Sequence, residues 1–87
     1  MKQYTIKQVR FGFNGYREHD YTGTLPELIE KFSFTLLKGH SWEHERGNKK
    51  INMQPKTIRS LIANLNNAES NAAANGSSNV SYELVEA

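Results

Sequence analysis

The chain has 87 residues, enough for one small domain with a thin core, and we expect a single domain over residues 1–87. It contains no Cys, which excludes disulfides, thiolate metal sites and a Cys nucleophile. The net charge is +2, but residues 38–59 carry six basic and two acidic side chains while residues 60–87 carry three acidic and no basic ones, an unevenness that argues against a mimic of DNA.

Residues 4–13 are expected to form a β-strand. Tyr4 and Ile6 fall on one side of an extended chain, whereas Val9 and Phe11 fall on the other. This change of parity indicates either a β-bulge or a strand that carries apolar side chains on both faces.

Asn14-Gly15 is the strongest hairpin signal in the chain, because both residues tolerate positive φ. It predicts a second strand over residues 16–22. A two-residue loop would pair Phe13 with Tyr16, whereas a three-residue loop over residues 13–15 would place Tyr21 on the side of Val9 and Phe11. We prefer the three-residue loop, because it aligns Tyr21 with apolar side chains.

A helix is expected to begin at Thr24, where Thr24-Leu25-Pro26-Glu27 matches a capping box with Pro in the first turn. Its end is expected at Gly39, since Gly commonly terminates helices. The apolar side chains recur at helical spacing and form one stripe: Leu25, Leu28, Ile29, Phe32 and Leu36, widened by Phe34 and Leu37.

A second helix is expected from Pro55, which suits a first turn. Its apolar stripe comprises Ile58, Leu61, Ile62, Leu65, Ala68 and Ala72. The opposite side is rich in Asn, a mediocre helix former, and includes Asn64, Asn67 and Asn71. Residues 80–85 alternate as a short final strand, with Val80, Tyr82 and Leu84 on one side.

The predicted element order is β-β-α-α-β. Strands before and after a pair of helices indicate an α+β domain, with a small antiparallel three-stranded sheet and two helices packed on one face. The last strand is expected to pair with the first.

Three stretches, GY-x₄-YTGTLPELIEKFSFTL, SWEHERGNKKIN and PKTIRSLIANLNNA, resemble small accessory proteins of tailed bacteriophages. The resemblance covers the chain from Tyr4 to about Ala68 and carries no catalytic motif. It implies a setting in the bacterial host cytoplasm during infection. It also implies inhibition of host machinery, since many short phage proteins, among them anti-CRISPR proteins, inhibit defence systems.

His40-Ser41-Trp42-Glu43-His44 matches H-x-x-E-H, the zinc motif of inverted zincin peptidases. That chemistry requires both His on one stable helix and a third ligand. Because the match follows the helix-terminating Gly39, we expect His40 and His44 to be exposed connector residues. We therefore expect no metal, no cofactor and no catalytic residue.

The basic segment at residues 46–50, Arg-Gly-Asn-Lys-Lys, has two interpretations. It is either a solvated turn or a loop that binds phosphates through N–H groups and cations, although it lacks the P-loop spacing. Cations at a helix N-terminus oppose the helix dipole, so Lys56 and Arg59 favour the functional interpretation.

Trp42 either covers the thin core or anchors an interface, because Trp and Arg dominate binding hot spots. The aromatic side chains of the hairpin, interleaved with basic ones, either pack under the helices or form a platform for single-stranded nucleic acid. That second set contains Tyr4, Phe11, Phe13, Tyr16 and Tyr21 with Lys7, Arg10 and Arg17.

The sequence therefore predicts a non-enzymatic protein that binds and inhibits a bacterial defence or host regulatory complex. Nucleic-acid or phosphorylated-ligand binding is the alternative, and the apolar stripes also permit a homodimer. No apolar run approaches the roughly 20 residues of a membrane span, so we expect no membrane partner. The candidate binding residues are Trp42, Arg46, Asn48, Lys49, Lys50, Lys56 and Arg59.

Overall fold

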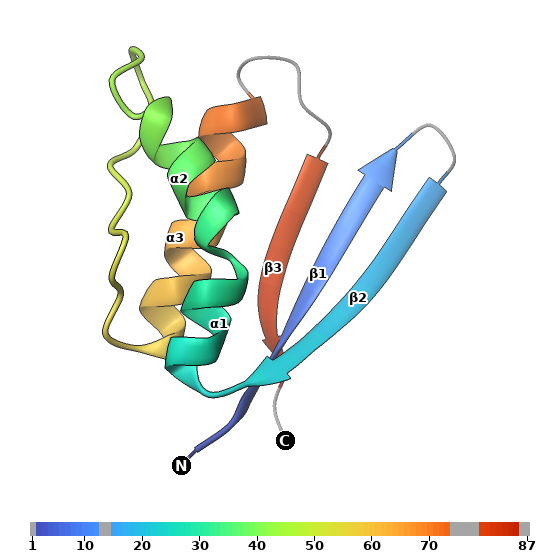
Figure 1. Ribbon diagram of the computed structural model, residues 1–87. Coiled ribbons are helices and arrows are strands. Elements are labelled where there is room, and N and C mark those ends of the chain that lie inside the picture. The colour runs from blue at the N-terminus through green and yellow to red at the C-terminus, as the bar shows by residue number, and fades with distance from the viewer. Residues whose placement is uncertain (1, 13–14, 74–78, 86–87) are drawn as a thin grey trace.

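The computed structural model describes residues 2–12, 15–73 and 79–85. The elements follow in the order β1 (Tyr4–Gly12), β2 (Gly15–Gly23), α1 (Leu25–Lys31), α2 (Ser33–Ser41), α3 (Ile58–Ala73) and β3 (Asn79–Val85). The strands form one antiparallel sheet in the order β2-β1-β3, and the helices lie on one of its faces (Figure 1). The predicted α+β class and the pairing of the last strand with the first are confirmed.

The hairpin register differs from the preferred one. Phe11 pairs with Tyr16 and Gly12 with Gly15, so both registers considered from the sequence are wrong. The expected turn falls partly on residues 13–14, which lie outside the described residues. The ladder continues without interruption to the pair Tyr4 and Gly23, and the strand therefore contains no bulge.

Apolar side chains occupy both faces of β1, as the second interpretation of its parity predicted. Ile6 and Gln8 are buried and mark the face that the helices cover. Val9 and Phe11 alternate with them and therefore lie on the open face. Tyr21 pairs with Ile6, so it lies on the helix side rather than beside Val9.

The helix expected over residues 24–38 consists of two segments joined at Phe32. The predicted capping box is present, because Thr24 Oγ1 accepts from the Glu27 N–H and Glu27 Oε1 accepts from the Thr24 N–H. The Phe32 ring lies edge-on between Tyr21 of β2 and Tyr82 of β3, with centroid distances of 5.1 and 5.5 Å. This aromatic stack joins the α1–α2 junction to both outer strands.

Gly39 does not end the helix, contrary to the prediction. It lies inside α2 and is buried against α3, where a Cβ built on it would sit 2.3 Å from the Ala68 Cβ. The absent side chain therefore permits close packing of the two helices. An ion pair between Lys38 Nζ and the buried Glu69 carboxylate, 2.9 Å apart, joins the same helices.

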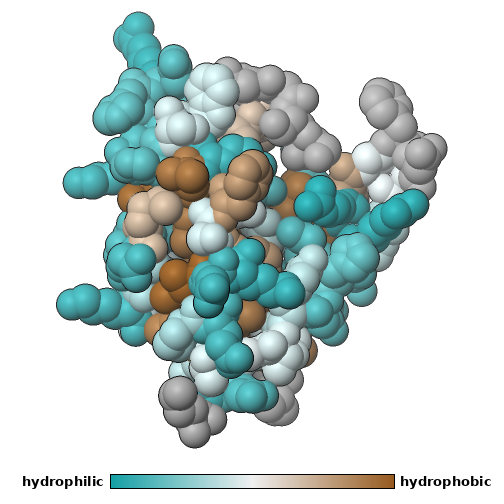
Figure 2. Space-filling view, viewed as in Figure 1, coloured by the Kyte–Doolittle hydropathy of each residue, from teal (hydrophilic) through white to brown (hydrophobic). Residues whose placement is uncertain are grey.

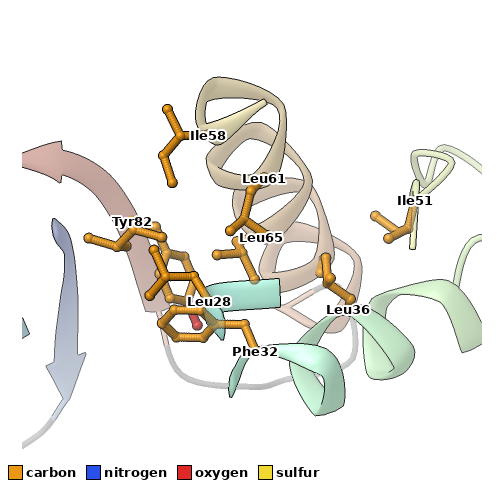
Figure 3. Close-up of a cluster of buried hydrophobic side chains, with 10 residues drawn as sticks. Leu28, Phe32, Leu36, Ile51, Ile58, Leu61, Leu65 and Tyr82 are labelled. Carbon is orange, nitrogen blue, oxygen red and sulfur yellow. The ribbon is translucent and has the colours of Figure 1, made fainter. Parts of the chain in front are cut away.

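The core lies between the sheet and the helices (Figure 3). The stripes of both predicted helices supply most of it, including Leu28, Leu36, Leu61 and Leu65, which are 0–1% exposed. The sheet contributes Ile6 and Tyr82. Ile51, which lies outside any helix or strand, enters the core from the side away from the sheet (Figure 3).

The second helix begins later than predicted. Pro55 is buried but precedes α3, which starts at Ile58. Thr57 caps the helix instead, because its hydroxyl accepts from the Ser60 N–H and its carbonyl from the Leu61 N–H. Side-chain hydroxyls at this position satisfy N–H groups that the first turn leaves unpaired.

We predict that Gly39→Ala lowers the free energy of unfolding by about 3 kcal/mol, because the new methyl group overlaps the main chain of Ala68. Gly12→Ala is the matched control, since nothing lies within 4 Å of a Cβ there, and its effect should be small. Urea denaturation measures both. An unchanged midpoint for Gly39→Ala would contradict the close packing.

Candidate functional site

The connector, residues 42–57 between α2 and α3, is held against α3 by Asn71. The Asn71 Oδ1 accepts from the Lys49 N–H at 2.9 Å, and its Nδ2 donates to the Lys49 carbonyl at 2.8 Å. The same Nδ2 lies 3.1 Å from the Gly39 carbonyl, to which it also donates. Asn71 is only 1% exposed, so these bonds fix the connector in place.

Two further Asn amides of α3 also bind main-chain groups, Asn64 those of the connector and Asn66 those of β3. Asn64 Oδ1 accepts from the Asn52 N–H at 2.8 Å, two helical turns from Asn71. Asn66 accepts from the Tyr82 N–H and donates to the Tyr82 carbonyl, which lie on the outer edge of β3. Asn64 and Asn71 were predicted on the side opposite the core stripe, but both are buried. Their spacing of seven residues is the signal that could have revealed a second packing face.

Glu43 of the H-x-x-E-H match also helps to hold the connector. Glu43 Oε2 accepts from the Ile51 N–H at 3.1 Å and contacts His40 Nδ1 at 2.9 Å. The hydrogen bond from Ile51 lowers the pKa of Glu43 below its usual 4.5, opposed by desolvation and assisted by His40. His44 is exposed. Within the described ranges, no three His, Asp or Glu side chains gather as ligands for a metal ion.

The structure divides the predicted binding residues into two groups. The basic turn, residues 46–50, lies at the end of α3 near Asn71, with the side chains of Arg46, Lys49 and Lys50 exposed. Lys56 and Arg59 are exposed at the opposite end of α3, about 20 Å away at 1.5 Å per residue.

Asn48 and Trp42 connect the basic turn to α2. Asn48 Nδ2 donates to the Trp42 carbonyl at 2.7 Å, and the Asn48 N–H donates to the Glu45 carbonyl at 3.0 Å. Gly47 between them has a positive φ of 84°, which favours Gly. Trp42 is half-buried, which gives it both a packed and a solvent-facing part.

An apolar surface on α1 and α2 was missed from the sequence. Phe34 and Leu37 were assigned to the core stripe, yet they are 76% and 55% exposed. They lie one helical turn apart on α2, and apolar side chains gather in the same region of Figure 2. Leu28, Phe32 and Leu36 recur every four residues and so share one side of the helical path. Phe34 and Leu37 do not fall in this series, and that difference is the signal that could have placed them outside the core.

A groove of about 490 Å³ lies between α1 and the connector. It is lined by Leu25, Pro26, Ile29, Glu30, Ser33, Met53, Gln54 and Pro55. Exposed Phe34 and Leu37 together with this groove are called the α1–α2 outer face below. Figure 1 shows the elements that carry these residues, α1, α2 and the connector, on the same side of the sheet.

The hairpin does not form the aromatic platform considered above. Tyr21 packs against Phe32, whereas Phe11 and Tyr16 stack on each other on the open face with ring centroids 5.4 Å apart. Lys7 also lies on that open face, with Glu18 3.9 Å away. The described aromatic and basic members of the set are thus divided between the two faces of the sheet, and Phe13 lies outside the described residues.

Comparison of the chain with protein-family models, with curated proteins and with solved structures finds no match. In the part of the chain that the structure describes, no helix has the length and apolar character to cross a membrane.

We predict that Asn71→Ala lowers the free energy of unfolding by about 3 kcal/mol, because it removes the three hydrogen bonds that this buried amide makes to the main chain of Lys49 and Gly39. Asn67→Ala is the matched control on the same helix, where the side chain is half-exposed. Thermal and urea denaturation measure both variants. Equal stability of the two variants would contradict the role of Asn71.

Proposed function

We propose that this chain is a non-enzymatic binding protein that docks on the surface of a protein partner through its α1–α2 outer face. The observation that carries the proposal is the exposure of Phe34 and Leu37, one turn apart on α2. Burying two such side chains in a partner supplies binding free energy, and an exposed apolar patch beside a groove is typical of interaction sites.

The basic turn supports the same interpretation. Arg46, Lys49 and Lys50 project from a main chain that Asn71 and Asn48 hold in one conformation. A rigid segment loses less conformational entropy when it binds than a mobile one. An apolar centre with charged residues around it resembles the arrangement of many interfaces.

The phage resemblance supplies the setting for this proposal. In that setting the partner is a bacterial defence or host regulatory complex, and docking inhibits it, as anti-CRISPR proteins do. A domain with a thin core suits this role, because an inhibitor requires a complementary surface rather than an enclosed catalytic pocket.

We predict that Phe34→Ser with Leu37→Ser abolishes inhibition while the fold is kept, because both side chains are exposed. The pair should weaken partner binding by about 30-fold or more, given 1–2 kcal/mol for each anchor. The assay is phage plating on bacteria that carry a defence system, with and without the expressed chain. Ala63→Ser, at an exposed position of α3, should inhibit like the wild type. Full inhibition by the folded double variant would refute the assignment of this face.

Nucleic-acid or phosphorylated-ligand binding is a second candidate, favoured by one observation. No ion pair joins Arg46, Lys49 or Lys50 to an acidic side chain within the described residues. If these cations bind phosphates, affinity for single-stranded DNA should fall steeply with salt, and Lys49→Ala with Lys50→Ala should lower the slope by about 2. Undetectable binding at low ionic strength would exclude this candidate.

A further inference from the structure

The two edges of the sheet differ in the described part of the chain. On β3, the Asn66 amide occupies both the N–H and the carbonyl of Tyr82, at 2.8 and 3.0 Å. On the other side, β2 ends the strand order and no described strand pairs with its outer edge. Residues 15–20 are all exposed, and this part of the hairpin extends away from the helices (Figure 1). The edge of β2 is therefore open to pairing.

The charged side chains of β2 are sorted by face. Arg17 pairs with Arg10 and His19 with Gln8, which places both on the helix-facing side. Glu18 and Asp20 alternate with them and lie on the open side. On β2, the formally positive side chain of Arg17 thus lies on one face, and the negative side chains of Glu18 and Asp20 lie on the other.

This sorting disfavours antiparallel pairing with a second copy of the chain at this edge. Two copies joined edge to edge by antiparallel β2 strands around a two-fold axis place residues of the same face opposite each other. No register of that kind brings a basic residue of β2 opposite an acidic one. Glu18 would instead face Glu18 or Asp20 in the closest registers, and like charges directly opposite are unfavourable.

The charge on the helix-facing side lacks a counterpart. Arg10 and Arg17 stand directly opposite each other on neighbouring strands, an unfavourable arrangement for like charges. No ion pair links either of them to an acidic side chain in the described ranges. On the open side, by contrast, Lys7 lies 3.9 Å from Glu18. An added strand therefore meets uncompensated positive charge on one face only.

We propose that the edge of β2 binds an extended segment of a partner protein by β-strand addition. The segment carries acidic residues at alternate positions, facing Arg17 and His19, with uncharged β-branched residues between them. Main-chain hydrogen bonds to the open edge supply affinity, and the alternate acidic residues supply specificity. The α1–α2 outer face is not required for this interaction, so the two sites are independent.

The test uses a fluorescent peptide that alternates Glu and Thr, measured by anisotropy at low ionic strength. One control peptide has the same composition with the Glu residues consecutive, and another is N-methylated at alternate residues. We expect the alternating peptide to bind about tenfold tighter or better than both. Chemical shifts of the β2 amides should change on binding.

The protein variants locate the site. Arg17→Glu should weaken binding about tenfold or more, whereas Lys49→Glu and the Phe34→Ser, Leu37→Ser double variant should bind like the wild type. If the peptide with consecutive Glu binds as tightly as the alternating peptide, the proposal is overturned, because net charge would then explain the binding without strand addition. Retained binding by Arg17→Glu, or no binding of the alternating peptide by the wild type, would overturn it as well.

Discussion

The contact between Gly39 and Ala68 sets the distance between α2 and α3. Because Gly39 has no side chain, the two helices approach until a Cβ at this position would overlap the Ala68 Cβ and Cα, at 2.3 and 2.4 Å. This approach brings the Gly39 carbonyl within 3.1 Å of Asn71 Nδ2. Asn71 can then bind α2 and the connector at once, so the helix pair and the connector form one packed unit.

The surface features follow from that unit. The Lys49 main chain is fixed by Asn71 and the Asn52 N–H by Asn64, so the connector runs along α3 and does not extend into solvent. Residues 46–50 of the connector form the basic turn. Residues farther along it, Met53 and Pro55, line the groove beside α1. The proposed docking face thus depends on buried amides that do not touch the partner themselves.

Periodicity predicted the parts of the fold that depend on apolar burial. The stripes through Leu28 and Leu36 in the first helix and through Leu61 and Leu65 in the second supply the core as expected. The prediction that the helix ends at Gly39 was wrong, because Gly can either end a helix or permit close helix packing. The packing partner, Ala68, is distant in sequence and could not be identified from the local pattern. The hairpin register depends on the turn geometry, which the Asn-Gly signal alone does not determine.

The candidate site was predicted less completely. The exposed cations of residues 46–50 and 56–59 follow from their charge, but their division into two groups depends on the path of the connector. Asn71 was placed opposite the apolar stripe, and the periodicity of apolar residues does not show that a polar side chain on that side is buried. Phe34 and Leu37 were assigned to the core because they are apolar. They are exposed because they lie on the side of α2 that faces away from the core.

The central claim is that the side chains of Asn64 and Asn71 on α3, together with Glu43 at the start of the connector, hold the connector in a single conformation. Native-state amide hydrogen exchange tests it most directly, residue by residue. The amides of Lys49, Ile51 and Asn52 donate to Asn71, Glu43 and Asn64, so we predict that they are protected although they lie in no helix or strand. Exchange of these three amides at the rates of an unstructured peptide would contradict the claim.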